Sequence, residues 1–405
     1  MTTKLSRTKP NLSAAPVRGA ISPPPTRKRR RSSAEASNPN NPLADETRNT
    51  VTPLPPDAIR VFSWNINGIA PFVQPSISSF LTSASNSLNA SRPTTPSLRA
   101  FLRRNQWPHI VNLQEVKINP SDDATKKAVE KAVSHRGRND PDCGPDYAVH
   151  FCLPRDKFNA RGFGRKVYGV ATIIRKDFSA DEVVAVREVD WDLEGRILVV
   201  ETKSKLSIWN IYAVNGTDNP YKDPVTGQVT GTRHDRKLAF HNLLLQECRR
   251  LESQGWRVVL TGDLNISPRP VDGFPKIRTN PEQHVRNRAD YNTKFLDEKN
   301  VDGLRAIDSF RYLHPESRKY TWISTTRPWL SSCDRVDHIL VSRSIVDADH
   351  AATSERHQDD GAKPVGTAVG ISLLEADILM TEADRATSDH VPIYVTLKVK
   401  TSAVE

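Results

Sequence analysis

The stretch WRVVLTGDLNISP, residues 256–268, decides the fold of this chain. Its first five residues, Trp256–Leu260, form a short apolar and β-branched run that follows a helical pattern closed by Gly255. This run is therefore predicted to be a buried strand of an α/β sheet. Asp263 and Asn265 follow at the strand end, where α/β folds usually keep their chemistry. The alternative is a turn, which Asp and Asn also form often.

Composition indicates a globular protein with an added basic tail. The chain has 405 residues, 37% of them hydrophobic and 26% charged, and its net charge is +11. Residues 1–50 hold ten Lys and Arg and three acids, so +7 of that charge belongs to the tail. No apolar run approaches a membrane span, and no membrane partner is expected. The scattered cysteines have no zinc spacing and indicate the reduced thiols of an intracellular protein.

Residues 1–57 are predicted to be a disordered tail, because they are rich in Pro, Ser, Thr and Asn and lack apolar periodicity. Within the tail, Arg27–Arg31 form a basic cluster that favours nuclear import or a nucleic-acid contact. The alternative interpretation of the tail is a mitochondrial presequence, since no acidic residue precedes Glu35. The helix-breaking prolines of the tail count against it.

Apolar runs and turn signals predict a succession of strands over the rest of the chain. The expected strands are 59–64, 109–113, 147–153, 168–174, 197–201, 207–212, 256–260, 320–323, 335–341, 376–380 and 391–399. An amphipathic helix is predicted at about 232–254, and shorter helices at 98–102, opened by Thr95 and Pro96, and at 287–298. Segment 119–145 is expected to be a polar surface loop, either without helix or with one helical turn; 217–231 is expected to be a polar loop, and 349–369 a disordered insertion.

Short polar motifs recur at the ends of these strands. They are Asn65 and Asn67, Glu115, Tyr212 and Asn215, Asp263 and Asn265, Asp337, and Asp389 and His390. Each motif alone has a structural explanation as a turn or a surface pair, but their recurrence in one chain favours a common site. Oxygen ligands without cysteine suit a hard cation such as Mg²⁺ or Mn²⁺. Such a cation with His, Asp and Asn is suited to hydrolysis of a phosphodiester.

Five motifs in fixed order carry a resemblance to a known family. They are SWNING (63–68), LQE (113–115), GDLN (262–265), DRVDHIL (334–340) and SDH (388–390), with a Tyr-x-x-Asn at 212–215 between them. Residues 58–400 thereby resemble the exonuclease III and abasic-site endonuclease branch of the endonuclease/exonuclease/phosphatase superfamily. The resemblance implies one catalytic domain with the DNase I-like fold. That fold is a four-layer α/β sandwich, two mixed β-sheets face to face with helices outside.

The resemblance also implies a role for each site residue. The expected metal ligands are Asn65, Glu115, Asp263, Asn265, Asp389 and His390, with Glu115 the principal carboxylate. The residues expected to act in catalysis are Tyr212, Asp263, Asn265, Asp337 and His390. Asp263 and Asn265 match the pair that activates water and stabilises the pentacoordinate phosphate, and Asp337 matches the partner that orients His390. Asn215, Trp322 and His390 are expected to bind substrate.

Departures from the pattern of this branch concern the substrate pocket. Asp334 stands where a Trp commonly forms a wall of the abasic-sugar pocket, and Val214 stands where Pro is usual. An acid close to the DNA phosphates should weaken binding. Trp322 matches the other aromatic of the pocket, and Trp329 is expected to replace the missing one. Catalysis is therefore expected to be intact, while specificity for abasic sites is open.

Three functions follow from this reading. The first is a Mg²⁺-dependent DNA-repair nuclease, with Mn²⁺ as the other metal, that cuts double-stranded DNA 5′ to abasic sites and trims blocked 3′ ends. The second is a nuclease of the same chemistry with another nucleic-acid substrate, such as a 3′→5′ exonuclease. The third is a phosphoesterase acting on a lipid or inositol phosphate. A monomer located in the nucleus is expected.

Overall fold

The computed structural model describes residues 51–73, 96–134, 144–160, 168–347 and 370–400. The predictions for the tail up to residue 50 and for the insertion at 349–369 lie outside the described residues. None of the described helices is both long enough and apolar enough to cross a membrane.

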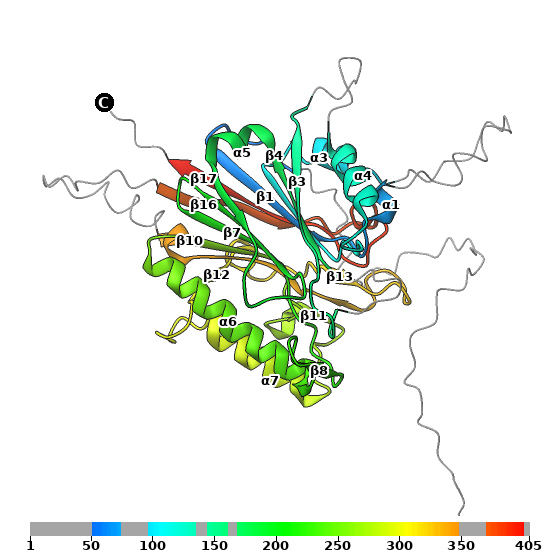
Figure 1. The fold of residues 1–405 in the computed structure, drawn as a ribbon. Helices are drawn as coiled ribbons and strands as arrows, with labels where there is room; N and C mark the ends of the chain where they lie inside the picture. Colours follow the sequence, from blue (N-terminus) through cyan, green and yellow to red (C-terminus); the bar gives the residue numbers. More distant parts are fainter. Residues whose placement is uncertain (1–50, 74–95, 135–143, 161–167, 348–369, 401–405) are drawn as a thin grey trace, which may run out of the picture. The chain divides into compact units, whose positions relative to one another are not determined.

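One six-stranded sheet holds the first and the last strands of the domain (Figure 1). Its strand order is β16 (Gly370–Ile378), β17 (Ile393–Lys400), β1 (Ala58–Asn65), β2 (Ile110–Gln114), β4 (Val170–Arg175) and β3 (Tyr147–Cys152). β1 and β2 are parallel and all other neighbours are antiparallel. The carboxyl ends of β1 and β2 therefore lie at the same edge of the sheet.

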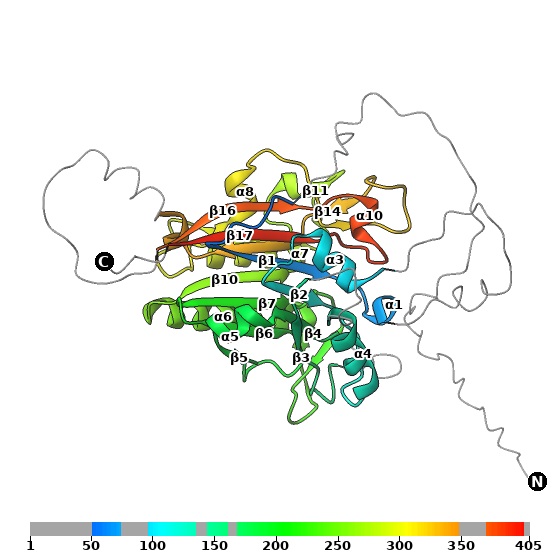
Figure 2. The same ribbon diagram turned by 90° about the horizontal axis from the view of Figure 1, so that it is seen from above.

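A second six-stranded sheet is built in the same style from the middle of the chain. Its order is β12 (Ile307–Asp308), β15 (Asp337–Val341), β10 (Arg257–Asp263), β7 (Leu206–Tyr212), β6 (Ile197–Thr202) and β5 (Val183–Arg187). β10 runs parallel to β7 and antiparallel to β15, so the ends of β7 and β10 meet the start of β15. The two sheets pack face to face, with β1 and β2 against β10 and β7 (Figure 2).

Helices cover the outer face of each sheet. On the first sheet these are α1 (Ala70–Val73), α3 (Leu98–Arg104) and α4 (Asp123–Val133), and on the second α6 (Arg233–Ser253), α7 (Glu282–Tyr291) and the π-helical turn η4 (Asn292–Leu296). Phe101 packs against Phe62, with ring centroids 5.5 Å apart, and Val129 belongs to the same core. Phe240 and Trp209 belong to the core of the second sheet. The predicted four-layer sandwich of two mixed sheets is confirmed.

Buried amide and hydroxyl side chains cross-link the two sheets. Gln114 Nε2 donates to Asn210 Oδ1 at 2.8 Å, and Asn112 Nδ2 donates to Thr261 Oγ1 at 2.8 Å. Asn210 Nδ2 in turn donates to the carbonyl of Ala171 at 2.9 Å. A fully buried polar group is costly unless it is hydrogen-bonded, so these pairs favour one alignment of the sheets over others. That alignment fixes which strand ends face each other.

Smaller elements complete the domain. A three-stranded sheet has the order β11 (Gly273–Phe274), β14 (Cys333–Asp334) and β13 (Trp322–Ile323), and β8 (Pro220–Lys222) pairs with β9 (Val229–Thr232). The remaining helical segments are α5 (Lys176–Glu182), η3 (Pro270–Asp272), α8 (Ser309–Leu313) and α10 (Glu382–Arg385). The three-stranded sheet matters for the site, because it places Trp322 directly opposite Asp334.

Several local predictions differ from the structure. Segment 119–145, expected to be a loop with at most one helical turn, contains the three-turn helix α4, whose first turn is capped by Asp122 through a 2.9 Å bond from the Thr125 amide. Its polar composition hid the two buried positions, Val129 and Val133, that anchor it. Segment 217–231 forms the β8–β9 hairpin instead of a loop.

The boundaries of two other elements also differ. Helix α3 is capped by Ser97, which accepts from the Ala100 amide at 3.2 Å, and not by Thr95 and Pro96 as predicted. Part of the predicted tail packs on the domain: Val51 is buried in the first core, and the Thr52 carbonyl accepts from Arg60 Nη1 at 2.7 Å. The buried Arg60 guanidinium needs hydrogen-bond acceptors, and the backbone before β1 provides one. The local sequence of this segment gave no sign of that contact.

Candidate active site

The polar motifs converge at one edge of the sandwich because of strand register. In the second sheet Asp263, the last residue of β10, lies opposite both Tyr212 at the end of β7 and Asp337 at the start of β15. In the first sheet Asn65 lies opposite Gln114, the residue before Glu115. Since the sheets face each other at this edge, the motifs of both enter a single site.

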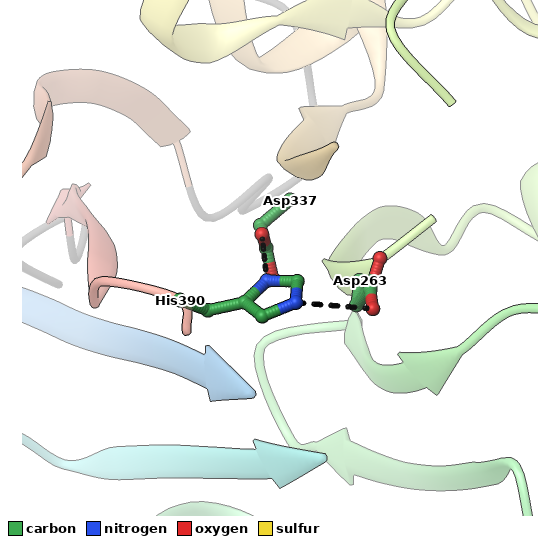
Figure 3. Close-up of side chains that lie close together, drawn as sticks. All are labelled: Asp263, Asp337 and His390. Carbon is green, nitrogen blue, oxygen red and sulfur yellow. Dashed lines mark hydrogen bonds and ion pairs between the residues drawn. The ribbon is translucent and has the colours of Figure 1, made fainter. Parts of the chain in front are cut away.

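His390 lies between two carboxylates of the second sheet (Figure 3). Its Nδ1 atom is 2.7 Å from Asp337 Oδ2, and its Nε2 atom is 4.0 Å from Asp263 Oδ2. The backbone around the ring is also held, because the His390 amide donates to Ser388 Oγ at 3.0 Å and its carbonyl accepts from Trp64 Nε1 at 3.1 Å. The imidazole is therefore fixed in direction, with Nε2 directed towards Asp263.

Burial and charge set the protonation of this group. Burial alone would lower the pKa of His390, but the charge and hydrogen bond of Asp337 outweigh it and raise the pKa to about 10. Burial, together with the negative charge of Asp337, raises the pKa of Asp263 to about 7. The imidazole is thus a cation at neutral pH, beside a carboxylate that exchanges a proton near neutrality.

Glu115 and Asn65 connect the first sheet to Asp263. The Asn65 amide Nδ2 donates to Glu115 Oε1 at 3.1 Å and to Asp263 Oδ2 at 3.0 Å. Lys117 Nζ lies 2.8 Å from Glu115 Oε2. Burial is the largest influence and would raise the pKa of Glu115, but the Lys117 charge and the hydrogen bonds from Lys117, Tyr212 and Asn65 together outweigh it, and the pKa is lowered. Glu115 is consequently ionised at neutral pH.

Asp389 belongs to the same hydrogen-bonded group. Its Oδ1 accepts from Asn67 Nδ2 and its Oδ2 accepts from Trp322 Nε1, both at 3.0 Å. Lys117 Nζ also donates to Asn67 Oδ1, which links Asp389 to Glu115 through two side chains. The Trp322 indole is therefore held in place by its nitrogen.

The loop after β10 places Asn265. Its backbone amide donates to Asp263 Oδ1 at 2.9 Å, and its side-chain Nδ2 donates to the Ala213 carbonyl at 3.0 Å. Asn265 has a φ of +53°, a left-handed conformation that Asn tolerates better than most residues. Lys237 from α6 donates to the Asn265 carbonyl at 2.8 Å and holds the loop from behind.

Tyr212 is hydrogen-bonded to Glu115, and its pKa is raised well above the usual value by burial and by the Glu115 charge. The Tyr212 ring packs 5.0 Å from the buried guanidinium of Arg196. The phenol is therefore neutral, and it keeps its proton for donation.

A cavity of about 300 Å³ lies at this edge. Its lining includes eight of the ten predicted site residues: Glu115, Tyr212, Asn215, Asp263, Asn265, Trp322, Asp389 and His390. The other two, Asn65 and Asp337, contact the lining through their hydrogen bonds to Glu115 and His390. The structure thus brings the whole predicted set together.

The cavity also has lining residues that no motif indicated. These are Ile266, Ser267, Arg278, His284 and Arg288. Lys117 was missed as well, although it lies two residues after Glu115 and its charge was a usable signal. Asp334 lines the cavity, as its place in the motif suggested. Trp329 does not line it, so its expected role as the replacement aromatic is wrong: its ring packs 4.7 Å from the Arg385 guanidinium.

Comparison with known proteins identifies the family. Residues 62–390 match the endonuclease/exonuclease/phosphatase family. The chain belongs to this family. The predicted resemblance to its exonuclease III and abasic-site endonuclease branch is confirmed by the relatives described next.

Two curated relatives are named for nuclease activities. The chain is 26% identical over 351 residues to DNA-(apurinic or apyrimidinic site) endonuclease 2 of Mus musculus, covering 78% of this chain and 61% of the mouse protein. It is 23% identical over 319 residues to exodeoxyribonuclease III of Haemophilus influenzae, covering 77% of this chain and 97% of that protein. The chain thus spans about three fifths of the mouse relative. These matches confirm the prediction of an enzyme of this family.

Two solved structures show the same fold. The Xenopus laevis APE2 catalytic domain matches with a TM-score of 0.52 at 21% identity, covering 86% of this chain and 94% of that one. An AP endonuclease from Archaeoglobus fulgidus matches with a TM-score of 0.50 at 16% identity, covering 83% of this chain and 98% of that one. Both likenesses concern the arrangement of the two sheets and their helices.

The residues expected to hold a cation fit a hard divalent ion. Glu115, Asn65 and Asp389 supply carboxylate and amide oxygens within one hydrogen-bonded group, the donors that Mg²⁺ prefers. Among the described residues, ligand atoms of Asp263, Asp337 and His390 also lie within 4.8 Å of one another. Because His390 already bonds Asp337 there, this second group suits proton transfer better than metal binding.

Proposed function

We propose that this chain is a Mg²⁺-dependent nuclease that hydrolyses the phosphodiester bond 5′ to abasic sites in double-stranded DNA and trims blocked 3′ ends. The observation that carries the proposal is the geometry around His390: a cationic imidazole fixed by Asp337 faces Asp263 in a cavity shared with Glu115. Sequence similarity to an abasic-site endonuclease and to an exodeoxyribonuclease supports DNA as the substrate.

In this proposal the charges of the site match those of a phosphodiester under attack. The His390 imidazolium binds a phosphate oxygen through Nε2, the nitrogen that Asp337 leaves free. Asp263, with a pKa near neutrality, accepts the proton of the attacking water. Asn265 and the Tyr212 hydroxyl are hydrogen-bond donors for the negative charge that develops.

The cation supplies the remaining positive charge. Glu115, Asn65 and Asp389 would hold it, and when bound it offsets negative charge on the phosphate and on the leaving oxygen. Mn²⁺ has similar ligand preferences and is proposed to substitute for Mg²⁺. Lys117 keeps Glu115 ionised, and an ionised carboxylate is the form that binds a metal.

A substrate panel tests the proposal. Purified protein is offered a duplex with one tetrahydrofuran abasic analogue, an intact duplex, a single strand and a soluble phosphoinositide, first with Mg²⁺ and then with EDTA. The abasic duplex should be cut fastest, on the 5′ side of the analogue, and EDTA should abolish the reaction. If only the phosphoinositide were hydrolysed, the chain would instead be a phosphoesterase that acts on a lipid or inositol phosphate.

A 3′→5′ exonuclease is the second candidate, and one observation favours it. Asp334 lines the cavity beside its cross-strand partner Trp322, so this wall of the cavity has one charged and one aromatic side chain. The sugar of an abasic site would need apolar contacts on both sides. An intact 3′-terminal nucleotide has polar edges that such a wall accommodates. In the same panel, release of mononucleotides from the intact duplex at a rate above cleavage of the abasic duplex would favour this candidate.

The basic cluster Arg27–Arg31 is proposed to direct the protein to the nucleus. Replacement of the cluster by alanines in a fluorescent fusion of the full chain should redistribute the protein to the cytoplasm. Unchanged nuclear fluorescence would contradict this proposal, and mitochondrial fluorescence of the parent fusion would favour the alternative reading of the tail.

A further inference from the structure

A basic group lines the active-site cavity away from the predicted motifs. Arg278, His284 and Arg288 belong to the lining, and His284 and Arg288 are both on helix α7. None of the three belongs to a strand-end motif, and the mechanism above gives none of them a role. Their presence beside the reaction centre needs a separate explanation.

The Arg288 side chain is held in one orientation by backbone carbonyls. Its Nε donates to the Ser267 carbonyl at 2.9 Å, and its Nη2 donates to the Arg278 carbonyl. Within the described part of the chain Arg288 forms no ion pair, and the acid whose charge acts on it is Asp334. A half-buried guanidinium that is fixed by neutral groups keeps its charge available for an anion.

The Arg278 side chain adds a second positive charge at the mouth. It is exposed, and it makes no ion pair with the described residues. Outside the reaction centre, the described lining of the cavity holds one acid near these two arginines, Asp334, whose Oδ1 accepts from Ser267 Oγ at 3.3 Å. One carboxylate beside two guanidinium groups leaves this wall with a net positive charge.

His284 lies among the same basic side chains. Burial first, and then the charges of Arg278, His234, Lys237 and Arg288, lower the pKa of His284 to about 4. Of these groups, the guanidinium groups of Arg278 and Arg288 carry the positive charge at neutral pH, and they define a region where an anion is favoured. This region is continuous with the cavity that holds His390 and Asp263.

We propose that Arg288, assisted by Arg278, binds the phosphate next to the one that is hydrolysed, and is a specificity-determining residue for substrates that carry both. This inference rests on the proposed function. His390 and the cation site neutralise the scissile phosphate, so the charge of Arg288 is left for a second anion. A cavity of about 300 Å³ is at the lower end of the usual range for ligand pockets.

A phosphate monoester or a free phosphate would not use this wall together with the reaction centre, because it supplies one anion. A nucleic-acid strand supplies phosphates in succession along its backbone. The preferred substrate is therefore a strand that continues beyond the scissile bond. Removal of one phosphate charge at a time from the strand tests whether a second phosphate is bound.

The test uses duplexes with a neutral methylphosphonate in place of one phosphate. The replacement is made on the 5′ neighbour of the scissile phosphate, on the 3′ neighbour, or several nucleotides away. Wild-type protein should lose about 10-fold to 100-fold in kcat/KM for one neighbour and little for the distant position, as expected for a lost charge-assisted hydrogen bond. On the unmodified duplex, the kcat/KM of Arg288→Met should be lower than that of wild type by about the same factor. The variant should cleave the unmodified duplex and the duplex with the neighbouring methylphosphonate at equal rates.

Matched variants separate charge from folding. Arg286→Met removes an exposed arginine of the same helix that pairs with Glu282 and does not line the cavity, so it should behave as wild type. Arg288→Lys should restore part of the discrimination. Equilibrium binding of the duplex in EDTA gives a readout without turnover: the slope of log K against log salt should fall by about 0.9 in Arg288→Met and remain unchanged in Arg286→Met.

Each remaining outcome contradicts one claim. If wild-type protein cuts DNA but Arg288→Met keeps the full methylphosphonate penalty, the second phosphate site is wrong and the proposed function stands. Arg288→Met could also be slower than wild type and still show the same methylphosphonate penalty and the same slope of log K against log salt. In that case Arg288 only supports the fold of the loop. If wild-type protein cuts none of the duplexes, the proposed function fails and this inference fails with it.

Discussion

Nδ1 of His390 lies 2.7 Å from Oδ2 of Asp337, and both side chains are almost fully buried. This bond determines which nitrogen of His390 is left for chemistry, and it accounts for the raised pKa of the imidazole. The two residues come from segments 53 positions apart in the sequence. Their contact is produced by the pairing of β15 with β10 and by the bridge between Trp322 and His390.

Asp337→Asn removes the negative charge and keeps the shape of the side chain. The pKa of His390 should fall from about 10 towards or below its usual value, because burial is then opposed only by weaker charges. Turnover at neutral pH should drop by about 10²-fold or more, as the imidazolium is lost. NMR titration of the His390 ring and a rate–pH profile measure both effects. Asp181→Asn, an exposed change far from the motifs in sequence, is the control.

Lys117→Met tests the charge that keeps Glu115 ionised. Without the ammonium at 2.8 Å, burial should raise the pKa of Glu115, since burial is the largest influence on this group. The acid limb of the rate–pH profile, where protonated Glu115 no longer binds metal, should move to higher pH. The exposed Lys127→Met should leave the profile unchanged. An unshifted acid limb in Lys117→Met would mean that another group sets it.

Asp334→Asn removes the acid from the wall of the cavity. Burial raises the pKa of Asp334 to about 6, so the side chain is charged at pH 8 and largely neutral at pH 5. The variant should bind duplex DNA more tightly than wild type at pH 8, by about 2-fold to 10-fold at low salt, because one repulsion is lost. The difference should disappear at pH 5. Fluorescence anisotropy in EDTA measures it, and equal affinities at pH 8 would argue against contact with the DNA phosphates.

His109 gives a prediction for stability that does not involve the site. Its Nδ1 accepts from the Arg60 amide at 3.2 Å, and burial lowers its pKa to about 3. Between pH 3 and 6.5 the unfolded chain therefore binds a proton that the folded chain does not, and the free energy of unfolding rises with pH. From pH 5 to 6.5 this group alone contributes about 2 kcal/mol. His109→Asn, which keeps an acceptor, should flatten this slope in urea titrations; an unchanged slope would contradict the assignment.

Much of the site could be predicted because its residues follow strands that have a clear local signal. The run before Asp263 and the run before Glu115 are apolar and short, and parallel strands bring their carboxyl ends to one edge. The order of motifs then supplied the remaining members, including Asp337 and His390. The positions of these residues at strand ends came from the local sequence, while their roles came from the resemblance to the family.

Other features depend on packing between distant segments and left no local pattern. The hydrogen-bonded pairs Gln114–Asn210 and Asn112–Thr261 lie between the sheets. In the sequence, each of these residues is only a polar position in a predicted strand. Arg288 lies on a helix whose polar sequence gave no sign of which face meets the cavity. The helix α4 was missed for the same reason, since few of its residues are buried.

The most direct test of the central claim is the single-turnover rate of Asp263→Asn on a duplex with one tetrahydrofuran analogue in Mg²⁺. The substitution keeps the size of a side chain that Asn65 and the Asn265 amide both contact, and removes the group proposed to accept the proton of water. The rate should fall by about 10²-fold or more, with thermal stability close to that of wild type. A rate within a few-fold of wild type would show that this cavity is not where the phosphodiester is cleaved.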